Sequence, residues 1–203
     1  MAIVVEHEKR KKEILEKALK IFVEEGYEDV TFQKIADRCN ITRTTLYIYF
    51  KNKREIFLWS IKQLTEALEK DLVAIVKDES LSSEKCLRTV LEKITDELCK
   101  NKELFYVLLT YLLELRKKQT ENVAERVQRR VIRLRHLLTA IIVRGQKSGE
   151  FRDIPVKSIN EMFYSLLESA IFRISVLSDI DVETVHANLN IAVDSILKNQ
   201  IIY

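Results

Sequence analysis

The chain has 203 residues, of which 47% are hydrophobic, so it can form one or two domains with a substantial core. The formal net charge is only +3, and three glycines and one proline leave few breaks, so we expect an all-α fold and exclude an extensive sheet. The longest apolar stretch, Leu104 to Leu113, is far shorter than the about 20 residues of a membrane span, and we expect a cytoplasmic protein with no membrane partner.

The first predicted element is an amphipathic helix over residues 7–25. The residues at helical spacing on its inward face are Ile14, Leu15, Ala18, Ile21 and Phe22. We expect this helix to brace the two short helices that follow it.

Residues 31–53 have the caps and spacing of a compact helix-turn-helix. Thr31 can accept hydrogen bonds from the first amides of a short helix, and Asn40 can adopt the left-handed conformation that ends it. Ile41 then supplies a buried anchor, and Thr42 supplies the N-cap of a second short helix.

The second short helix has distinct inward and outward faces. Leu46 and Phe50 share the inward face, and the small Ala36 of the preceding helix allows the two helices to cross closely. Thr44 and Ile48 then point outward. In motifs of this kind the N-terminal end of the second helix meets the base edges of DNA.

Residue chemistry on this face suits DNA. The Arg43 fork fits guanine O6 and N7, and threonine hydroxyls can bond to base edges. Tyr47 and Tyr49 can position phosphates, and Asn52 can cap the next helix so that its amides face a phosphate. Between residues 31 and 54, six basic residues oppose one acid for a net +5, which concentrates the positive charge here. The alternative interpretation is a three-helix core with an ordinary solvated basic face.

The stretch from Ile14 to Phe57 resembles the N-terminal domain of the tetracycline-repressor (TetR) family of transcriptional regulators. The similarity includes the Ile35-Ala36 pair and the run from Thr45 to Lys53. Asn40 stands where the family usually has Gly, and Ile48 replaces a commonly aromatic or His position. The resemblance implies base or near-base contacts by Gln33, Arg43, Thr44 and Thr45, and phosphate contacts by Thr31, Thr42, Tyr47, Tyr49 and Lys53.

The resemblance and the helical pattern predict two domains and about nine helices. A helix-turn-helix DNA-binding domain would occupy residues 1–53, and a helical effector-binding and dimerisation domain residues 54–203. A helix over about 53–76 would link them and act as a lever. Further helices are expected near 82–100, 102–117, 121–147, 156–178 and 182–200, with plausible caps at Ser82 or Ser83, Thr120 and Asp181.

The last two predicted helices are the expected homodimer surface. In residues 156–178 one apolar stripe, from Ile159 to Ile174, is joined by a second one, which implies burial on two sides. The second stripe, which we assign to the dimer interface, consists of Ser165, Ser169, Phe172 and Val176. A monomer with an unusually apolar helix is the alternative.

The body is expected to bind a small organic effector, and no cofactor or metal is predicted. His7, His136 and His186 are scattered, without ligands at metal-binding spacing. The candidate ligand-binding residues are Trp59, Tyr106, Tyr111, Glu114, Arg133, His136, Phe163 and Glu168.

These features together favour a ligand-responsive homodimeric repressor that binds double-stranded DNA at a palindromic operator. A DNA-bound adaptor or activator whose body recruits a protein partner is the alternative. No catalytic constellation is recognisable, so we do not expect an enzyme. Cys39, Cys86 and Cys99 match no metal-binding spacing and are expected to be reduced core residues.

Overall fold

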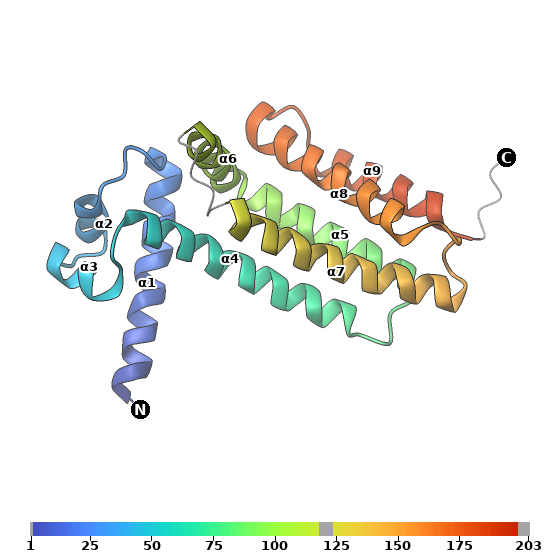
Figure 1. The fold of residues 1–203 in the computed structure, drawn as a ribbon, viewed down its shortest axis with the longest axis horizontal. Helices are drawn as coiled ribbons and strands as arrows, with labels where there is room; N and C mark the ends of the chain where they lie inside the picture. The colour runs from blue at the N-terminus through green and yellow to red at the C-terminus, as the bar shows by residue number, and fades with distance from the viewer. Residues whose placement is uncertain (1, 118–123, 199–203) are drawn as a thin grey trace. The chain divides into compact units, whose positions relative to one another are not determined.

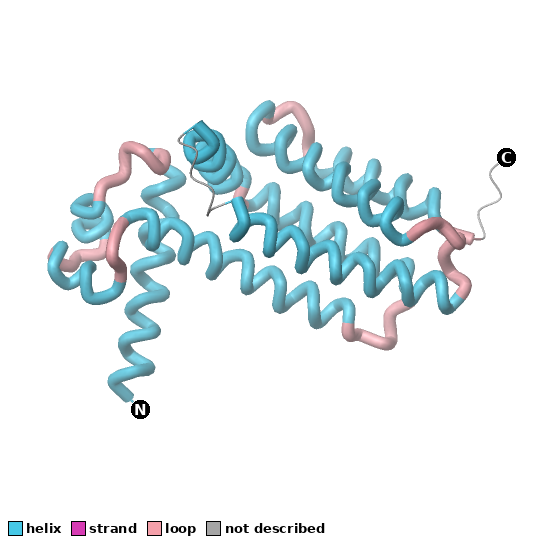
Figure 2. Tube along the Cα trace, viewed as in Figure 1, coloured by secondary structure: helices cyan, strands magenta, loops and turns pink. Residues whose placement is uncertain are grey.

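The computed structural model describes residues 2–117 and 124–198, and these form helices joined by loops (Figures 1 and 2). Outside the helices, the described residues hold one isolated antiparallel bridge, between Phe151 and Leu197, and no strand. The helices are α1 (Ala2–Glu25), α2 (Phe32–Arg38), α3 (Arg43–Tyr49), α4 (Lys53–Val76), α5 (Ser83–Lys100), α6 (Lys102–Lys117), α7 (Ala124–Ser148), α8 (Val156–Phe172), the π-helical segment η2 (Arg173–Leu177) and α9 (Val182–Ile196). The prediction of an all-α fold is confirmed.

Most predicted helices lie within a few residues of the observed ones. The main difference is at the start, where α1 begins at Ala2 instead of residue 7. The helix predicted over 156–178 is divided, because its last turn is the π-helical segment η2, which ends at Ser178 in the left-handed region with φ of 52°. Ser82 and Asp181 cap α5 and α9 as expected, whereas the proposed cap Thr120 lies outside the described residues.

The chain divides into two compact units. The first unit comprises Met1–Ala67 and Val107–Tyr111, and the second comprises Leu68–Tyr106 and Leu112–Tyr203. Helices α4 and α6 therefore each contribute residues to both units. The first unit extends past residue 53, where we predicted the boundary between the DNA-binding and effector-binding domains. The functional division into these two domains stays a prediction.

The first unit has its own hydrophobic core. All five residues predicted on the inward face of α1 are buried. Helix α1 packs against α2, where Ile35 and Ala36 are buried, and α2 packs against α3, where Leu46 is buried. Ala36 has no exposed surface, as the close crossing of α2 and α3 requires. The buried Ser60 hydroxyl donates to the Leu15 carbonyl at 3.1 Å, which ties α4 to α1 within this unit.

The core of the second unit is built around α5. This helix packs against α7, α8 and α9 through a buried face that includes Leu87, Val90 and Leu91. Where α7 ends, Gly145 accommodates the ring of Phe151, because a Cβ at residue 145 would lie 2.2 Å from Phe151 Cδ2. The chain can therefore reverse tightly between α7 and α8.

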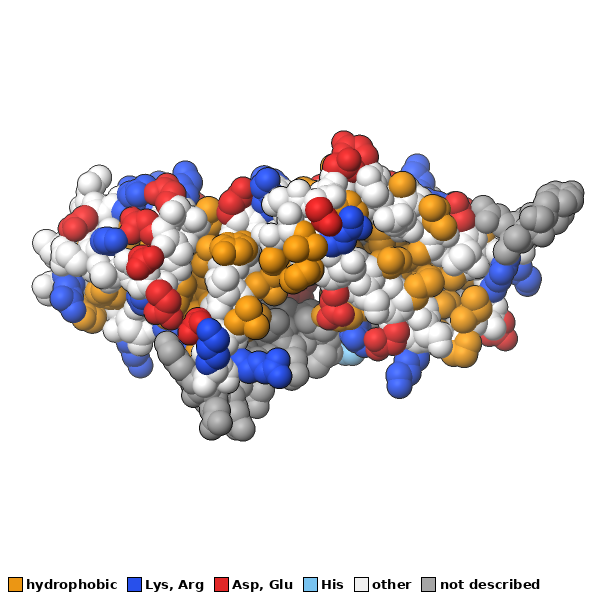
Figure 3. All heavy atoms as spheres, turned by 90° about the horizontal axis from the view of Figure 1, so that it is seen from above, with side chains coloured by type: hydrophobic (Ala, Val, Ile, Leu, Met, Phe, Trp, Pro, Cys, Tyr) orange, Lys and Arg blue, Asp and Glu red, His pale blue; other side chains and the backbone are white. Residues whose placement is uncertain are grey.

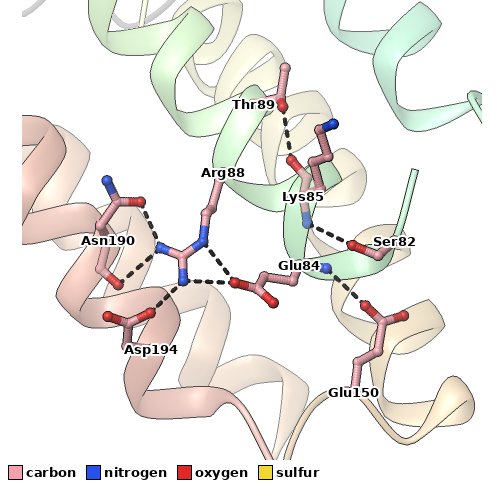
Figure 4. Close-up of polar contacts among 8 residues, drawn as sticks. All are labelled: Ser82, Glu84, Lys85, Arg88, Thr89, Glu150, Asn190 and Asp194. Atoms are coloured by element: carbon pink, nitrogen blue, oxygen red, sulfur yellow. Dashed lines mark hydrogen bonds and ion pairs between the residues drawn. The ribbon is translucent and has the colours of Figure 1, made fainter.

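A polar network on Arg88 joins α5 to α9 (Figure 4). The Arg88 guanidinium donates to Glu84 Oε1 at 3.0 Å and to Asn190 Oδ1 at 2.7 Å, and it also pairs with Asp194. The Glu84 amide donates to Glu150 Oε2 at 3.1 Å. The network therefore holds the N-terminal half of α5 to both the C-terminal half of α9 and the turn after α7.

Candidate DNA-binding site

The turn between α2 and α3 is built from local hydrogen bonds. Thr31 Oγ1 accepts from the Lys34 amide at 3.2 Å and so caps α2. At the other end the Asn40 amide donates to Asp37 O and the Ile41 amide donates to Ala36 O, both at 3.0 Å. This pair of bonds is a Schellman motif, which needs a left-handed residue at the position of Asn40. Asn40 has φ of 54°, as the sequence predicts.

Helix α3 starts at once after this turn. Thr42 Oγ1 accepts from the Thr45 amide at 3.0 Å and lies 2.8 Å from Thr45 Oγ1. Leu46 and Phe50 are buried, whereas Ile48 is 69% exposed and Tyr47 is 50% exposed. The predicted inward and outward directions of α3 are confirmed, and its exposed face is available to a partner.

The aromatic side chains of α3 are held in place by neighbours. The Tyr47 ring packs on Phe32 with centroids 4.6 Å apart, and its hydroxyl accepts from Arg43 Nη2 at 3.2 Å. The Tyr49 ring stacks on His7 of α1 at 4.5 Å. Arg43, Tyr47 and Tyr49 are therefore oriented before any ligand arrives, which lowers the entropy cost of binding.

Lys53, which the family resemblance assigns to a phosphate, makes internal bonds in this structure. Its Nζ donates to the carbonyls of Tyr27 at 2.8 Å, Glu28 at 2.9 Å and Val30 at 2.8 Å. An ammonium has three hydrogens, and these three acceptors can use all of them. The same Nζ lies 4.6 Å from the Tyr27 ring centroid. In this structure Lys53 closes the loop between α1 and α2.

Part of the positive charge on this unit is neutralised by α1. Lys34 Nζ lies 2.6 Å from Glu25 Oε2, and Arg38 Nη2 lies 2.6 Å from Glu24 Oε2. These acids precede the 31–54 window used to count charge, so the sequence count did not include them. The field toward DNA therefore depends more on Arg43 than the net +5 of that window implies.

Two side chains cap the start of α4 in a variant of the capping box, with the Glu55 carboxylate bonded to the amide before the N-cap. Asn52 Oδ1 accepts from the Glu55 amide at 2.9 Å, and Glu55 Oε2 accepts from the Lys51 amide at 2.6 Å. Asn52 is thus the predicted cap. Because Glu55 already puts a carboxylate at this helix start, the site is less favourable for a phosphate than the sequence suggests.

The remaining predicted DNA contacts lie in two places. Gln33 is exposed on α2 and donates to Asp37 Oδ1 at 2.7 Å. Thr31, Thr42 and Thr44 are exposed at or beside the helix starts. The predicted set therefore lies on α2, α3 and their caps, apart from Lys53, and its contacts with DNA stay a prediction.

Tyr111, a predicted ligand-binding residue, is placed in the core of the first unit. Its ring lies 4.4 Å from Tyr27 and 5.0 Å from Phe57, centroid to centroid, and it is 4% exposed. Burial, followed by the nearby Tyr111, raises the pKa of Tyr27 well above its usual range. Trp59 also belongs to the first unit, and its ring centroid lies 4.4 Å from Lys11 Nζ and 4.2 Å from Lys62 Nζ.

The other predicted ligand-binding residues lie in the second unit and do not converge. Arg133 pairs with Glu69 at 3.0 Å, and Glu114 pairs with Lys117 at 2.7 Å. Phe163 is fully buried in the core, whereas Tyr106 is half exposed and Glu168 is exposed. His136 is the member of the set that lines a described cavity, between α7 and α8.

An apolar surface lies on α8, η2 and α9. Ser165, Ser169, Phe172 and Val176, the predicted dimer residues, are all exposed. Leu177 and Ile191, which the sequence did not single out, are 52% and 65% exposed. Figure 3 shows hydrophobic side chains gathered over these C-terminal helices. Such a surface is typical of a protein–protein contact, and the dimer itself stays a prediction.

Metal and thiol chemistry have little support in the described part of the chain. Residues 2–117 and 124–198 contain no group of three His, Cys, Asp or Glu side chains able to hold a metal ion. Burial raises the pKa of the Cys39, Cys86 and Cys99 thiols, which disfavours the reactive thiolate. Within the same residues, no helix combines the length and apolar character that crossing a membrane requires.

Comparisons with known proteins agree with this geometry. Residues 14–58 match the family model described as bacterial regulatory proteins, tetR family. The chain is 27% identical over 164 residues to the fatty acid metabolism regulator protein of Bacillus subtilis strain 168, covering 78% of this chain and 80% of that one.

Solved structures show the same fold. A TetR transcription regulator from Haloarcula marismortui aligns with a TM-score of 0.83 at 21% identity, covering 94% of this chain and 100% of that one. The regulator FadR from Bacillus subtilis, solved in complex with stearoyl-CoA, aligns with a TM-score of 0.73 at 21% identity, covering 89% and 96%.

The capped α2–α3 pair and these similarities define a class, the helix-turn-helix DNA-binding transcriptional regulators. Within that class, the family model over residues 14–58 and the sequence and structural neighbours support a TetR-family regulator.

Proposed function

We propose that the chain is a homodimeric repressor that binds a palindromic operator and is released by a small amphipathic effector. The observation that carries the proposal is the α3 helix, capped by Thr42 and presenting its N-terminal end with Arg43 oriented by Tyr47. A rigid exposed helix start of this kind suits insertion into the major groove.

Base reading would be done by the start of α3 and its neighbour α2. Arg43 can reach guanine O6 and N7 as a fork, and Thr44 and Thr45 can meet base edges or thymine methyl groups. Gln33 would add a contact from α2. Thr31, Thr42, Tyr47 and Tyr49 would hold phosphates and so fix the register of the helix on the duplex.

Dimerisation would use the exposed face of α8, η2 and α9. In a single chain this face exposes four large hydrophobic side chains to water, those of Phe172, Val176, Leu177 and Ile191. A second copy of the chain would remove this surface from water. In a two-fold symmetric dimer, the same residues of each subunit form the interface. Two recognition helices about one DNA turn apart would then read a palindrome.

The proposed effector is a long-chain acyl-CoA. The support is the similarity to a fatty acid metabolism regulator over most of both chains, together with the fold shared with FadR, which was solved with stearoyl-CoA. This effector class is organic and amphipathic, and the proposed function includes no resident cofactor and no catalytic step.

Coupling between effector binding and DNA binding would run along α4. This helix is continuous from Lys53 to Val76, and its residues belong to both units. An effector that favours one setting of α4 would change the separation of the two DNA-binding units and hence their joint affinity for the operator. The adaptor alternative is not favoured, because the similar proteins are regulators and one of them binds a small molecule.

The test is selection of genomic DNA fragments by the purified protein, followed by addition of stearoyl-CoA. We expect enrichment of a short palindrome by the wild type, loss of that enrichment in Arg43→Ala, and release of the palindrome by stearoyl-CoA. Lys147→Ala, at an exposed position on α7, is the matched control and should select the same palindrome. Binding that depends on salt but selects no sequence would contradict the repressor proposal.

A further inference from the structure

Ile48 is the most exposed of the large hydrophobic side chains in the described part of the chain. Its relative exposure is 69%, compared with 65% for Ile191 on α9 and 58% for Leu113 on α6. A single exposed apolar side chain needs no explanation on an arbitrary surface. Ile48, however, stands on α3, the helix that also carries Arg43 and Thr44. The group that it would meet in DNA therefore decides its role.

Neither packing nor helix propensity accounts for an isoleucine at this position. The inward face of α3 consists of Leu46 and Phe50, which are both buried. Ile48 is two residues from each of them, which is a rotation of about 200° around the helix axis and places it on the opposite face. A β-branched residue also loses side-chain freedom in a helix, so a short helix in water gains no stability from it. The Ile48 side chain is thus available to a partner outside the chain.

Two tyrosines flank Ile48 on α3. At about 100° per residue, Tyr47 and Tyr49 lie on either side of the outward direction of Ile48. The Tyr47 ring packs on Phe32 of α2 with centroids 4.6 Å apart, and the Tyr49 ring stacks on His7 of α1 at 4.5 Å. Each tyrosine is therefore held by a different neighbouring helix. In the proposed interface both tyrosines hold phosphates, which directs Ile48 toward the floor of the groove between them.

Thr44 sets the level of Ile48 along the groove. The two residues are four apart, so they share the outward face of α3 and lie about 6 Å apart along its axis. Successive base pairs are about 3.4 Å apart. The base that Ile48 meets is therefore within about two base pairs of the base that Thr44 meets.

The floor of the major groove offers few groups that suit an isoleucine side chain. Guanine, cytosine and adenine present hydrogen-bond donors and acceptors there, and an isoleucine side chain can satisfy neither kind. Covering a polar base edge without a hydrogen bond costs free energy. Thymine adds a 5-methyl group, which is the apolar group among the four unmodified base edges. Contact between this methyl group and Ile48 would remove apolar surface of both from water.

We propose that Ile48 contacts the 5-methyl group of a thymine and so selects a T·A base pair in each half of the operator. The inference rests on the proposed function, because it adds a specificity-determining residue to the proposed DNA interface. Arg43 would select guanine through hydrogen bonds, whereas Ile48 selects thymine through an apolar contact. 5-Methylcytosine carries a methyl group at the same place in the groove, so Ile48 can also accept that modified base.

The experiment uses the operator that the genomic selection identifies and measures its affinity for the full chain by fluorescence anisotropy. Each thymine is replaced in turn by uracil, which lacks the methyl group but keeps the O4 acceptor and the pairing with adenine. At one thymine of each half-site, we expect uracil to weaken wild-type binding by about fourfold per half-site, as the burial of one methyl group predicts. Ile48→Ala should bind the thymine and uracil operators equally at that position.

Two further measurements identify the group that reads the methyl. Thr44→Ser, the matched control, loses the methyl group of the neighbouring outward residue and keeps its hydroxyl. It is judged by the ratio of its affinities for the thymine and uracil operators, which should equal the wild-type ratio. Cytosine at the same position should weaken wild-type binding, and methylation of that cytosine at C5 should restore part of the loss in the wild type but not in Ile48→Ala.

The outcomes separate this inference from the repressor proposal. Because Ile48 is exposed and alanine is the better helix former, Ile48→Ala should fold like the wild type, which thermal unfolding checks. A response to uracil that persists in Ile48→Ala, or wild-type binding that no uracil changes, overturns the role of Ile48 and leaves the repressor proposal standing. Failure of the wild type to select any sequence overturns the repressor proposal and this inference with it.

Discussion

Replacing Lys53 by Met decides between two roles for this side chain. The family resemblance implies that Lys53 contacts a DNA phosphate, whereas in the structure its ammonium donates to the carbonyls of Tyr27, Glu28 and Val30. Methionine has nearly the same length and keeps the apolar contacts of the lysine stem, but it removes the charge and all three donors. The substitution therefore separates a loop clamp from a phosphate contact.

The expected loss of stability follows from the three bonds. Hydrogen bonds to charged groups contribute about 1.5 to 3 kcal/mol each, so a simple sum would exceed 4 kcal/mol. Lys53 is only half buried, and water can reach part of the released carbonyl surface. We therefore expect Lys53→Met to lower the free energy of unfolding by about 2 to 4 kcal/mol, toward the upper end for single substitutions.

Urea unfolding followed by circular dichroism measures this change, and DNA binding at several salt concentrations measures the other role. Lys51→Met, at an exposed position two residues earlier, is the control and should change stability by less than about 0.5 kcal/mol. If Lys53→Met unfolds like the wild type and lowers the salt slope of DNA binding by about 1, then Lys53 grips a phosphate and the clamp reasoning is wrong.

Four further predictions test other features of the chain. Arg43→Ala should weaken operator binding by about 1 to 3 kcal/mol and relax selection at one base pair, as measured by anisotropy with single-base operator variants. Asn40→Gly should be tolerated, because glycine adopts φ of 54° without strain. Asn40→Val should lower stability by about 1 to 2 kcal/mol in thermal unfolding, because valine is strained at this φ, and equal stability of the two variants would refute this reasoning. Arg88→Ala should lower unfolding free energy by about 1 to 3 kcal/mol, and the Asp194→Ala double-mutant cycle should show coupling between the two residues. Hydrogen bonds from Thr184 lower the pKa of Asp181 below its usual 3.8, so its cap stabilises α9 above that value and is lost as pH falls through the folded pKa. Asp181→Asn should therefore reduce the loss of stability on acidification in unfolding curves, and an unchanged pH profile would show that this carboxyl does not contribute.

Some side-chain roles could be assigned from the sequence and others could not. The eight candidate ligand-binding residues were chosen by type, and the structure distributes them between the two units, with Tyr111 in an aromatic cluster and Phe163 in the core. The cavity between α7 and α8 is lined in part by the buried Asn160, which the sequence did not single out. A buried amide with one unsatisfied oxygen has no sequence signal, because its partners Thr139 and Arg135 lie more than 20 residues away.

By itself the sequence determined the helices, the caps at Thr31, Thr42 and Asn52, and the left-handed turn at Asn40. Each of these depends on hydrogen bonds between residues at most five apart, so local chemistry is sufficient. Only the tertiary structure decided that Lys53 closes the α1–α2 loop across a separation of 23 to 26 residues and that Glu24 and Glu25 neutralise cations of α2. Such partners are chosen by the packing of α1 against the helix-turn-helix, which the order of residues along any one segment does not contain.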